Sequence, residues 1–343
     1  MPTRGSIPCG HCAAEPGTLA CPGCGLEVCA DCAADRASCS KARAVEFRLG
    51  LGARLRSIDP TCRWGLATGV MGTWTLIDLR TLRPANMPRH QSLVLEPGIR
   101  PDGSIAGAIT NGGFQLGQRD YGPSVTGELD RSGAVIVGFD DVKVSVFDLA
   151  AEVAVGLDPP RTDFDPFPRR IVQAATHDSG RILCATYGEI AVWTSDGKRQ
   201  LQSIEIDGLD TLWLGLAGDT IAALVSSGGG FRKREIELAL WRASDGRAIA
   251  RARLGKVRKP LADLSGDGRV AVAADDHSAV VVIAEDETGP RRLEGHSDGL
   301  CSLGVATDGS RLVSGDFDNR VIARERGLDG FATRLESAAL QPV

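Results

Sequence analysis

The residues of this chain with the clearest chemical potential are the cysteines near its start. Seven of the ten cysteines fall within residues 9–39, and six of these form three C-x-x-C pairs. The pairs are Cys9 with Cys12, Cys21 with Cys24, and Cys29 with Cys32, and Cys39 follows alone. Thiolates at this spacing can share one tetrahedral ion, and in a reducing compartment such a cluster holds zinc more often than disulfides. We therefore expect a zinc-binding module in residues 1–42.

Two ligand arrangements remain open for this module. Only four residues separate Cys24 from Cys29, so a site shared by neighbouring pairs would be cramped, and we favour a cross-brace with two zinc ions. The first ion would be held by Cys9, Cys12, Cys29 and Cys32. The second would be held by Cys21, Cys24 and Cys39, with Asp35 as the fourth ligand. In the alternative, one four-thiolate site holds a single zinc ion and the other thiols are spare. His11 is expected to be solvated rather than a ligand.

The order of these cysteines resembles that of a B-box-type zinc finger, a relative of the RING finger with two cross-braced zinc ions. The resemblance covers about residues 7–42. The family closes its second site with two histidines, whereas Cys39 with Asp35 stands in their place here. The resemblance implies a protein-interaction module, and some relatives recruit ubiquitin-conjugating enzymes.

Composition and charge exclude several classes of protein. The 42 glycines in 343 residues, about 12% against an average near 7%, favour tight-turned β structure over long helices. The 39 basic and 44 acidic residues give a net charge of −5 with both signs interspersed, so no broad cationic surface for nucleic acid is expected. Residues 1–8 contain no apolar leader segment, and no run of 18 apolar residues occurs. We expect a soluble, cytoplasmic protein that binds neither nucleic acid nor membrane.

Polar turns that contain aspartate recur along residues 55–343 at a nearly regular spacing. They are centred on Asp59, Asp102, Asp130, Asp178, Asp219, Asp267 and Asp308. Their mean separation is about 41 residues, and most are followed by a short apolar strand, a second turn and an alternating strand, as in residues 133–148 and 268–283. Such units are typical of β-propellers, in which each unit forms one four-stranded antiparallel blade. The predicted fold class is therefore all-β.

The last unit, residues 293–325, resembles a WD40 repeat. Gly295 and His296 match the Gly-His dipeptide of that family, and Asp318 matches its turn aspartate. The resemblance implies that His296 and Asp318 form a hydrogen-bonded network within the blade, through Ser314. Arg324 and Glu325 replace the usual Trp-Asp pair. The resemblance extends over residues 55–340, although the other units lack the Gly-His dipeptide.

The predicted organisation has three parts: a zinc finger in residues 1–42, a linker in residues 43–54, and a WD40-like propeller in residues 55–343. The seven turns predict seven blades. Six is the alternative, because only 28 residues separate Asp102 from Asp130. Ring closure requires a strand from the far end of the chain, and either residues 45–49 or residues 331–340 complete the last blade. We favour the former, which would also hold the zinc finger against the ring.

Two other groups of residues have acid–base or ligand character. His296 and Asp318 combine an imidazole with a carboxylate, as a catalytic pair does, but their place in the repeat favours a role within the blade. Residues 177–178 and 275–277 combine histidine with aspartate, as a metal site would. Both lie at expected hairpin ends, where turn geometry favours aspartate. We expect structural roles for all of them.

Three segments are candidates for contact with a partner. The densest basic segment contains Arg251, Arg253, Lys256, Arg258 and Lys259. It is either a solvated face or a contact for an acidic partner. Residues 226–234 join glycines to three basic residues without the spacing of a nucleotide-binding loop, so we expect a long hairpin there. The proline-rich residues 158–168 either pack on the ring or dock a partner.

No enzyme motif is present in the sequence: it has no nucleophile elbow, no His-Glu-x-x-His and no nucleotide loop. We therefore expect a non-catalytic scaffold or adaptor whose propeller and zinc finger each dock a protein partner, with no small-molecule substrate. The Ala-, Arg- and Gly-rich composition suggests a bacterial source. In a bacterium, the resemblance to a zinc finger joined to a WD40-like propeller implies a signalling or conflict system. The alternative is a ubiquitin-ligase-like recruiter in which the propeller selects the substrate.

Overall fold

A computed structural model gives the fold, and its described residues form strands and turns but no helix. The described residues are 19–20, 27–28, 44–50, 53–69, 74–85, 94–99, 103, 105–110, 113–116, 119–120, 126–129, 135–139, 144–148, 153–157, 171–176, 181–186, 188–194, 199–206, 210–227, 235–257, 259–275, 277–285, 287–327, 330–333 and 335–337. Within these ranges, no helix has the length and hydropathy needed to cross a bilayer.

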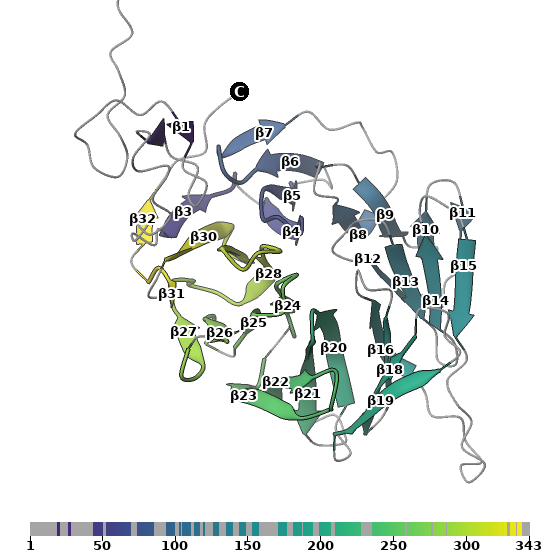
Figure 1. The fold of residues 1–343 in the computed structure, drawn as a ribbon. Coiled ribbons are helices and arrows are strands. Elements are labelled where there is room, and N and C mark those ends of the chain that lie inside the picture. The colour runs from purple at the N-terminus through teal and green to yellow at the C-terminus, as the bar shows by residue number, and fades with distance from the viewer. Residues whose placement is uncertain are drawn as a thin grey trace, which may run out of the picture.

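Seven antiparallel sheets succeed one another along the described chain (Figure 1). The first contains β4 (Arg54–Ile58), β5 (Trp64–Thr68), β6 (Trp74–Asp78) and β7 (Arg83–Ala85). The second contains β8 (Val94–Ile99), β9 (Ile105–Thr110), β10 (Gly113–Leu116) and β11 (Arg119–Asp120). The third contains β12 (Thr126–Leu129), β13 (Val135–Phe139), β14 (Val144–Asp148) and β15 (Val153–Leu157).

The next three sheets have the same sequential order of strands. The fourth contains β16 (Ile171–Thr176), β17 (Ile182–Thr186), β18 (Glu189–Trp193) and β19 (Gln200–Glu205). The fifth contains β20 (Asp210–Ala217), β21 (Thr220–Ser227), β22 (Glu235–Arg242) and β23 (Ala248–Gly255). The sixth contains β24 (Ala262–Leu264), β25 (Val270–Ala274), β26 (Val280–Ala284) and β27 (Arg291–Leu293).

The short interval between Asp102 and Asp130 falls across the second sheet. The second sheet nevertheless has four strands. The short interval is sufficient because the outer strand, β11, is only two residues long.

The seventh sheet combines both ends of the described chain. It contains β28 (Leu300–Val305), β29 (Arg311–Asp316) and β30 (Arg320–Gly327), and β31 (Gly330–Phe331) forms a hairpin with β30. The strand β3 (Ala44–Arg48), which precedes the first sheet in sequence, pairs antiparallel with β30. The strand β32 (Leu335–Ser337) then pairs parallel with β3. Both segments considered for ring closure therefore lie in this sheet, with β3 next to β30 and β32 outside it.

The sheets are linked by contacts that run in a cycle. Among the described strands, β4 contacts β8, β9 contacts β12, β13 contacts β16, β16 contacts β20, β20 contacts β24, β24 contacts β28, and β28 contacts β4. Figure 1 shows the sheets placed around a common centre. Hydrogen bonds join the seventh sheet to the first, from the N–H of Thr307 to the carbonyl of Pro60 at 2.9 Å and from Arg311 Nη2 to the carbonyl of Leu79 at 2.8 Å. This arrangement is compatible with a propeller-like fold.

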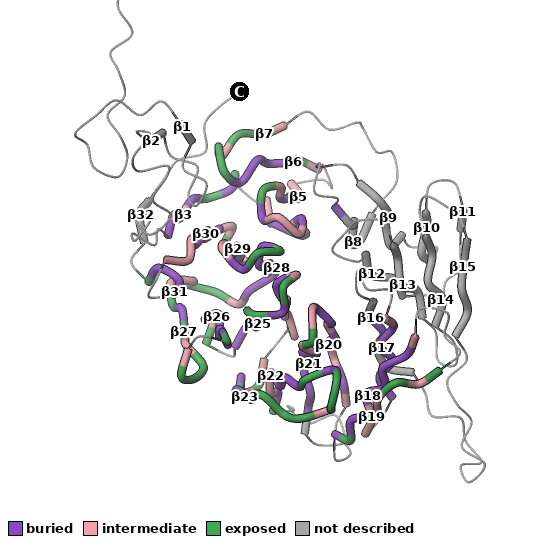
Figure 2. Tube along the Cα trace, viewed as in Figure 1, coloured by how far each residue is buried: buried purple, intermediate pink, exposed green. Residues whose placement is uncertain are grey.

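The hydrophobic core lies in separate layers between adjacent sheets. The layer between the fifth and sixth sheets includes Leu224, Leu238, Ala271 and Ile283. The layer between the seventh and first sheets includes Phe47, Leu55, Ile77, Val313 and Val321. A sheet with a neighbour on each face buries its inner strands completely, and all residues of β25 and β26 are buried. Exposed residues gather on outer strands such as β7 and β23 (Figure 2).

The Asp-Gly turns used to find the repeat have a clear conformational basis. In the turn between β24 and β25, Asp267 Oδ1 accepts hydrogen bonds from Ser265 Oγ at 2.6 Å and from the N–H of Arg269 at 3.0 Å. Gly268 follows with a φ of 76°, and a Cβ there would lie 2.3 Å from the carbonyl oxygen of Ala217. Only glycine fits both the left-handed conformation and the close approach of the fifth sheet.

The role of β3 can be tested by its buried side chain. Phe47 lies in the layer between the seventh and first sheets and is almost fully buried. Phe47→Ala should lower the free energy of unfolding by about 3–5 kcal/mol, because it leaves a cavity in this layer. Urea unfolding would measure the change. Arg48→Ala, which removes an exposed side chain from the same strand, should change stability by less than about 0.5 kcal/mol. A similar small effect for Phe47→Ala would show that β3 is not an integral part of the sheet.

Candidate functional site

Two aspartates organise equivalent turns in the sixth and seventh sheets. Asp275 Oδ1 accepts the N–H groups two and four residues later, both at 2.8 Å. Asp316 Oδ1 accepts the N–H groups at the same offsets, at 3.0 and 2.9 Å. The residue three positions after each aspartate has a positive φ, 62° in the first turn and 66° in the second. The Oδ2 atom of each carboxylate is left to bind a side chain: Arg292 Nε at 2.6 Å in the sixth sheet and His296 Nδ1 at 2.9 Å in the seventh.

The seventh sheet holds a buried network around His296. The side chain of His296 has no exposed surface, and Asp316 and Ser314 on β29 contact its two ring nitrogens. Nδ1 lies 2.9 Å from Asp316 Oδ2, and Nε2 lies 2.7 Å from Ser314 Oγ. Ser314 and Asp316 are two residues apart, so both side chains point to the same face of the strand. The predicted contact between His296 and Ser314 is therefore present.

The carboxylate assigned to this network from the sequence is wrong. We expected Asp318, but Asp316 is the residue that contacts His296. Asp318 lies in the turn after β29, where its Oδ2 accepts a hydrogen bond from Ser297 Oγ at 3.0 Å. The residue with a positive φ lies three positions after Asp316. In the equivalent turn of the sixth sheet, it lies three positions after Asp275. Aligning the two turns, rather than matching a family motif, would have identified Asp316.

Burial sets the protonation of this network. Burial lowers the pKa of His296 below its ordinary value, and the hydrogen bond and charge of Asp316 only partly oppose this. Burial acts to raise the pKa of Asp316, but hydrogen bonds from His296 and the N–H of Arg320 lower it overall. Asp316 is therefore ionised and His296 neutral near pH 7. Since a carboxylate can only accept, Nδ1–H donates to Asp316, and Nε2 accepts the hydroxyl proton of Ser314.

The connectivity of these three residues is that of a hydrolase triad, with Asp on Nδ1 and Ser on Nε2. Their surroundings are not. Ser314 is buried in the interior of β29, and neither His296 nor Asp316 exposes any side-chain surface. A substrate carbonyl has no route to Ser314 Oγ, whereas a nucleophile must meet its substrate at van der Waals distance. The network connects β29 to the segment that leads into β28, which is a structural role.

A buried cation adjoins this network on β30. Arg324 occupies the position where the WD40 resemblance places a tryptophan, and its side chain is fully buried. Its Nη2 donates to the carbonyl of Glu294, whereas Nε and Nη1 have no hydrogen-bond partner in the part of the chain that the structure describes. Burial, followed by the charge of Arg320, lowers the pKa of Arg324 to about 10. The seventh sheet thus carries an incompletely satisfied charge beside its histidine.

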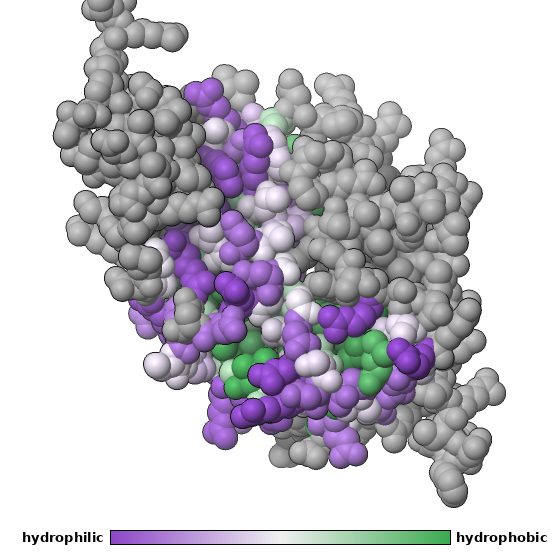
Figure 3. Space-filling view, viewed as in Figure 1, coloured by the Kyte–Doolittle hydropathy of each residue, from purple (hydrophilic) through white to green (hydrophobic). Residues whose placement is uncertain are grey.

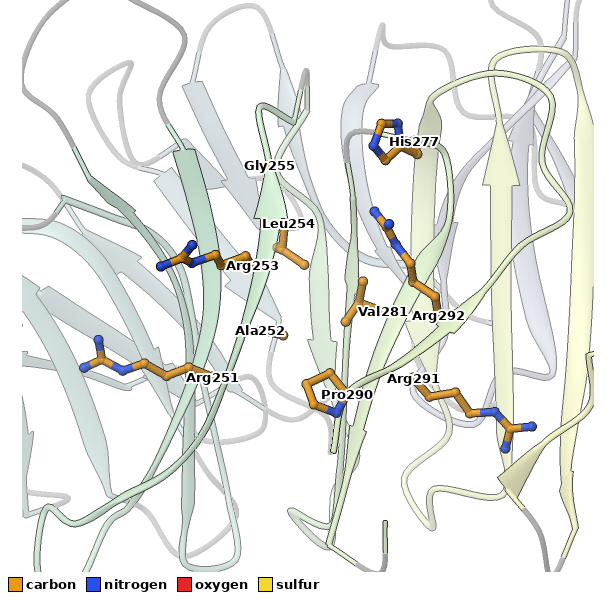
Figure 4. Close-up of a pocket in the computed structure, with 10 residues that line it drawn as sticks. All are labelled: Arg251, Ala252, Arg253, Leu254, Gly255, His277, Val281, Pro290, Arg291 and Arg292. Atoms are coloured by element: carbon orange, nitrogen blue, oxygen red, sulfur yellow. The ribbon is translucent and has the colours of Figure 1, made fainter. Parts of the chain in front are cut away.

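A groove of about 480 Å³ lies between the fifth and sixth sheets (Figure 4). The outer strand β23 forms one wall, and β26 and β27 form the other. Its lining includes apolar side chains from both walls, Ala252 and Leu254 on β23 and Val281 and Pro290 opposite them. His277 and Arg292 lie together at one end (Figure 4). Ala252, Leu254 and Val281 are buried, and the exposed residues of the groove are at its rim, where they include Pro290 and Arg292.

Arginines flank this groove. Arg251 and Arg253 project from β23 on the side away from the apolar lining, and Arg291 projects away from the groove on the other wall (Figure 4). Arg253 is 86% exposed and lies 3.5 Å from Glu237 Oε1, so this ion pair is a weak surface contact. Arg251 lies over the ring of Trp241 at 5.9 Å. None of the residues that line the groove is acidic.

The zinc ligands expected from the sequence lie outside the described residues. These are Cys9, Cys12, Cys21, Cys24, Cys29, Cys32, Cys39 and Asp35, and His11 lies outside them too. Within the described residues, no group of three or more His, Cys, Asp or Glu side chains is arranged to hold a metal ion. Other segments with predicted roles also lie outside the described residues. They are residues 158–168, 177–178 and 228–234, and Arg258.

Two short strands within the cysteine-rich segment are described. The strands β1 (Leu19–Ala20) and β2 (Glu27–Val28) pair antiparallel, with Leu19 opposite Val28. Cys21 and Cys24 therefore fall in the connection of a β-hairpin, and Cys29 directly follows its second strand.

The structure brings together cations that the sequence separates. Arg251 and Arg253 belong to the predicted basic segment, whereas Arg291 and Arg292 come from β27, about 40 residues later. The sequence reading missed the second pair, because strand pairing and sheet packing decide which distant residues share a groove. Asp275 and His277, considered as metal ligands, instead form the turn between β25 and β26.

The fold and its sites define a class of protein: an all-β chain of small antiparallel sheets in cyclic order, compatible with a propeller-like fold. Comparison with protein-family models and with curated proteins found no match to either. The function is therefore argued below from geometry and chemistry.

The His296 network predicts a defined loss of stability. His296→Ala removes the partner of Asp316 Oδ2 and of Ser314 Oγ, so the free energy of unfolding should fall by about 1–3 kcal/mol. Chemical denaturation at about pH 7.5 would measure it. Ser297→Ala is the control, since it removes only an exposed contact with Asp318 and should change stability by less than about 0.5 kcal/mol.

The same variants give a test of protonation. Because the pKa of His296 is lowered from 6.5 in the folded state, the unfolded chain binds the proton more tightly. The stabilisation from neutral His296 is therefore complete above about pH 6.5 and is lost as the pH falls below it. The difference between the wild-type protein and His296→Ala should shrink at about pH 5.5. A difference that grows on acidification would contradict a neutral His296.

Arg324 gives a prediction of opposite sign. Arg324→Met should raise the free energy of unfolding by about 1–3 kcal/mol, because it removes a buried charge whose Nε and Nη1 have no acceptor among the described residues. Thermal and urea unfolding would both report the gain. Arg324→Lys keeps a buried charge and should give no gain. Destabilisation by Arg324→Met would contradict this account and show that the hydrogen bond to the Glu294 carbonyl outweighs the cost of the buried charge.

Proposed function

We propose that this chain is a non-catalytic protein-interaction scaffold, with a seven-bladed WD40-like propeller in residues 55–343 and a zinc finger in residues 1–42. The cyclic succession of seven antiparallel sheets carries this proposal. Each sheet in such a ring buries both faces against its neighbours. The strand ends, their connecting loops and the outer edges therefore remain available to bind partners. The pairing of β3 with β30 supports ring closure by residues 43–54.

The buried His296 network supports a non-catalytic role for the propeller. It has the residue types of a hydrolase, but both ring nitrogens of His296 are occupied within the sheet and Ser314 is buried. Polar groups of this kind fix the geometry of a blade rather than transform a substrate. Arginines and a histidine instead line the groove between the fifth and sixth sheets.

The zinc finger is supported by the β1–β2 hairpin. A C-x-x-C pair in the connection of a tight hairpin can direct two sulfurs to one ion, and Cys21 and Cys24 have this position relative to β1 and β2. Thiolates would hold about two zinc ions per chain and supply most of the folding free energy of the finger. The ions would have no catalytic task. The finger would provide a second docking surface close to β3.

Metal analysis and partner binding test the two halves of this proposal. The purified chain should contain about two zinc ions, and Cys9→Ser with Cys29→Ser should lose about one without unfolding the propeller. In the cell that expresses it, the whole chain should retain a protein partner more strongly than the double variant, because linked modules act at high effective concentration. Cys62→Ser, at a buried cysteine outside the finger, controls for loss of a thiol. Less than about half an equivalent of zinc, or equal retention by both chains, would contradict the proposal.

A further inference from the structure

The outer strand of the fifth sheet has an unusual length and position. With eight residues, β23 is the longest outer strand among the described sheets, where the others have two to six. It pairs with β22 on one side, and no described strand pairs with its other edge. Its register with β22 is continuous from Ala250 to Arg253, with irregularities at either end. An edge of this kind presents backbone N–H and C=O groups that can pair with an added strand.

The two faces of β23 differ in chemistry. Ile249, Arg251 and Arg253 alternate along one face and are exposed, with Ile249 at 50%. Ala252 and Leu254 alternate on the other face and are buried in the hydrophobic layer between the fifth and sixth sheets. Figure 3 shows apolar surface between hydrophilic side chains at the edge of the molecule where Figure 1 places the fifth sheet. A strand added to β23 would meet cations on one face and, on the other, the rim of the groove, where Pro290 is exposed.

We propose that the free edge of β23 binds an extended peptide in which acidic and small apolar residues alternate. Side chains of neighbouring strands on the same face lie close enough to interact, so carboxylates of the peptide would pair with Arg251 and Arg253. The residues between them would face the groove, where Ala252, Leu254 and Val281 are buried and Pro290 is exposed at the rim. The backbone would supply affinity, and the alternation would supply specificity.

Charge complementarity selects this occupant. The exposed face of β23 carries Arg251 and Arg253, in a chain whose net charge is −5, and none of the residues that line the groove is acidic. Three carboxylates approach the arginines of the groove from neighbouring elements. Glu237 lies 3.5 Å from Arg253, Asp275 pairs with Arg292, and Glu287 lies near Arg291 around Gly330. Arg251 and Arg253 remain the cations most accessible from the edge of β23. A second copy of this edge would bring arginines against arginines, which disfavours self-pairing.

The inference rests on the proposed docking function, but its test uses a defined probe. A fluorescent eight-residue peptide that alternates aspartate with valine matches β23 in length. Its controls carry serine or lysine in place of aspartate, or have the aspartates grouped at one end. Anisotropy titrations against the full chain should give the tightest binding for the alternating acidic peptide. Its affinity should weaken with added salt, because the pairs are exposed.

Charge reversal on the protein provides the decisive comparison. The double variant Arg251→Glu with Arg253→Glu should bind the acidic peptide with an affinity lower by about tenfold or more. It should bind the lysine peptide more tightly than the wild-type protein does. Arg199→Glu with Arg269→Glu makes the same change in net charge at exposed positions away from the groove and should have little effect. Thermal unfolding of both double variants would confirm that they fold. Tighter binding of the lysine peptide also requires that β23 is folded. A misfolded variant therefore cannot produce the expected result.

Four results would overturn the inference. The first result is equal affinity for the serine and aspartate peptides, and the second is unchanged affinity of the double variant Arg251→Glu with Arg253→Glu for the acidic peptide. Either would mean that the arginines only protect the edge of β23 against aggregation. Tighter binding of a single-stranded oligonucleotide at the same residues would identify nucleic acid as the occupant. A dimer in light scattering that the charge reversal abolishes would identify a second copy. If the natural partner still binds the charge-reversed chain, the docking function stands and only its assignment to β23 fails.

Discussion

The structure depends on one constraint: each sheet must bury both of its faces against a neighbour. The inner strands are apolar on both sides, as β25 and β26 show by their complete burial, so a linear stack would leave two apolar faces in water. The contacts from β28 to β4 bring the last sheet against the first. The strand β3 then pairs with β30, and Phe47 fills the layer between those two sheets. Burial of this interface is what holds the two ends of the array together.

The polar residues of the interior are used to shape turns and join strands. Asp275 and Asp316 accept backbone N–H groups at the same offsets, and each has one oxygen left for a side chain. Arg292 fills that role in one sheet and His296 in the other. The same type of turn thus accommodates different side-chain partners, because the carboxylate needs a hydrogen-bond donor but not a particular residue. Arg324 is an exception, because its Nε and Nη1 atoms have no hydrogen-bond acceptor in the part of the chain that the structure describes.

The remaining chemistry lies on the outer edges. In the first six sheets, no described strand pairs with the outer side of the fourth strand, and most of these strands are short, which limits unwanted pairing. The strand β23 departs from this rule and has arginines on its exposed face. Its neighbour β27 adds further arginines across a groove. The contacts that stabilise the fold therefore lie between the sheets, whereas the proposed binding surface lies along an outer edge.

The sequence by itself determined the all-β class, the spacing of the Asp-Gly turns and the alternation of the strands, because these depend on residues near one another in the chain. It also placed His296 beside Ser314, since both lie in one repeat. It misassigned Asp318, because the side-chain direction at a strand end depends on where the positive φ falls. It could not place Arg291 and Arg292 beside β23, nor β32 outside β3. Those contacts join distant segments, and only the packing of complete sheets against one another decides them.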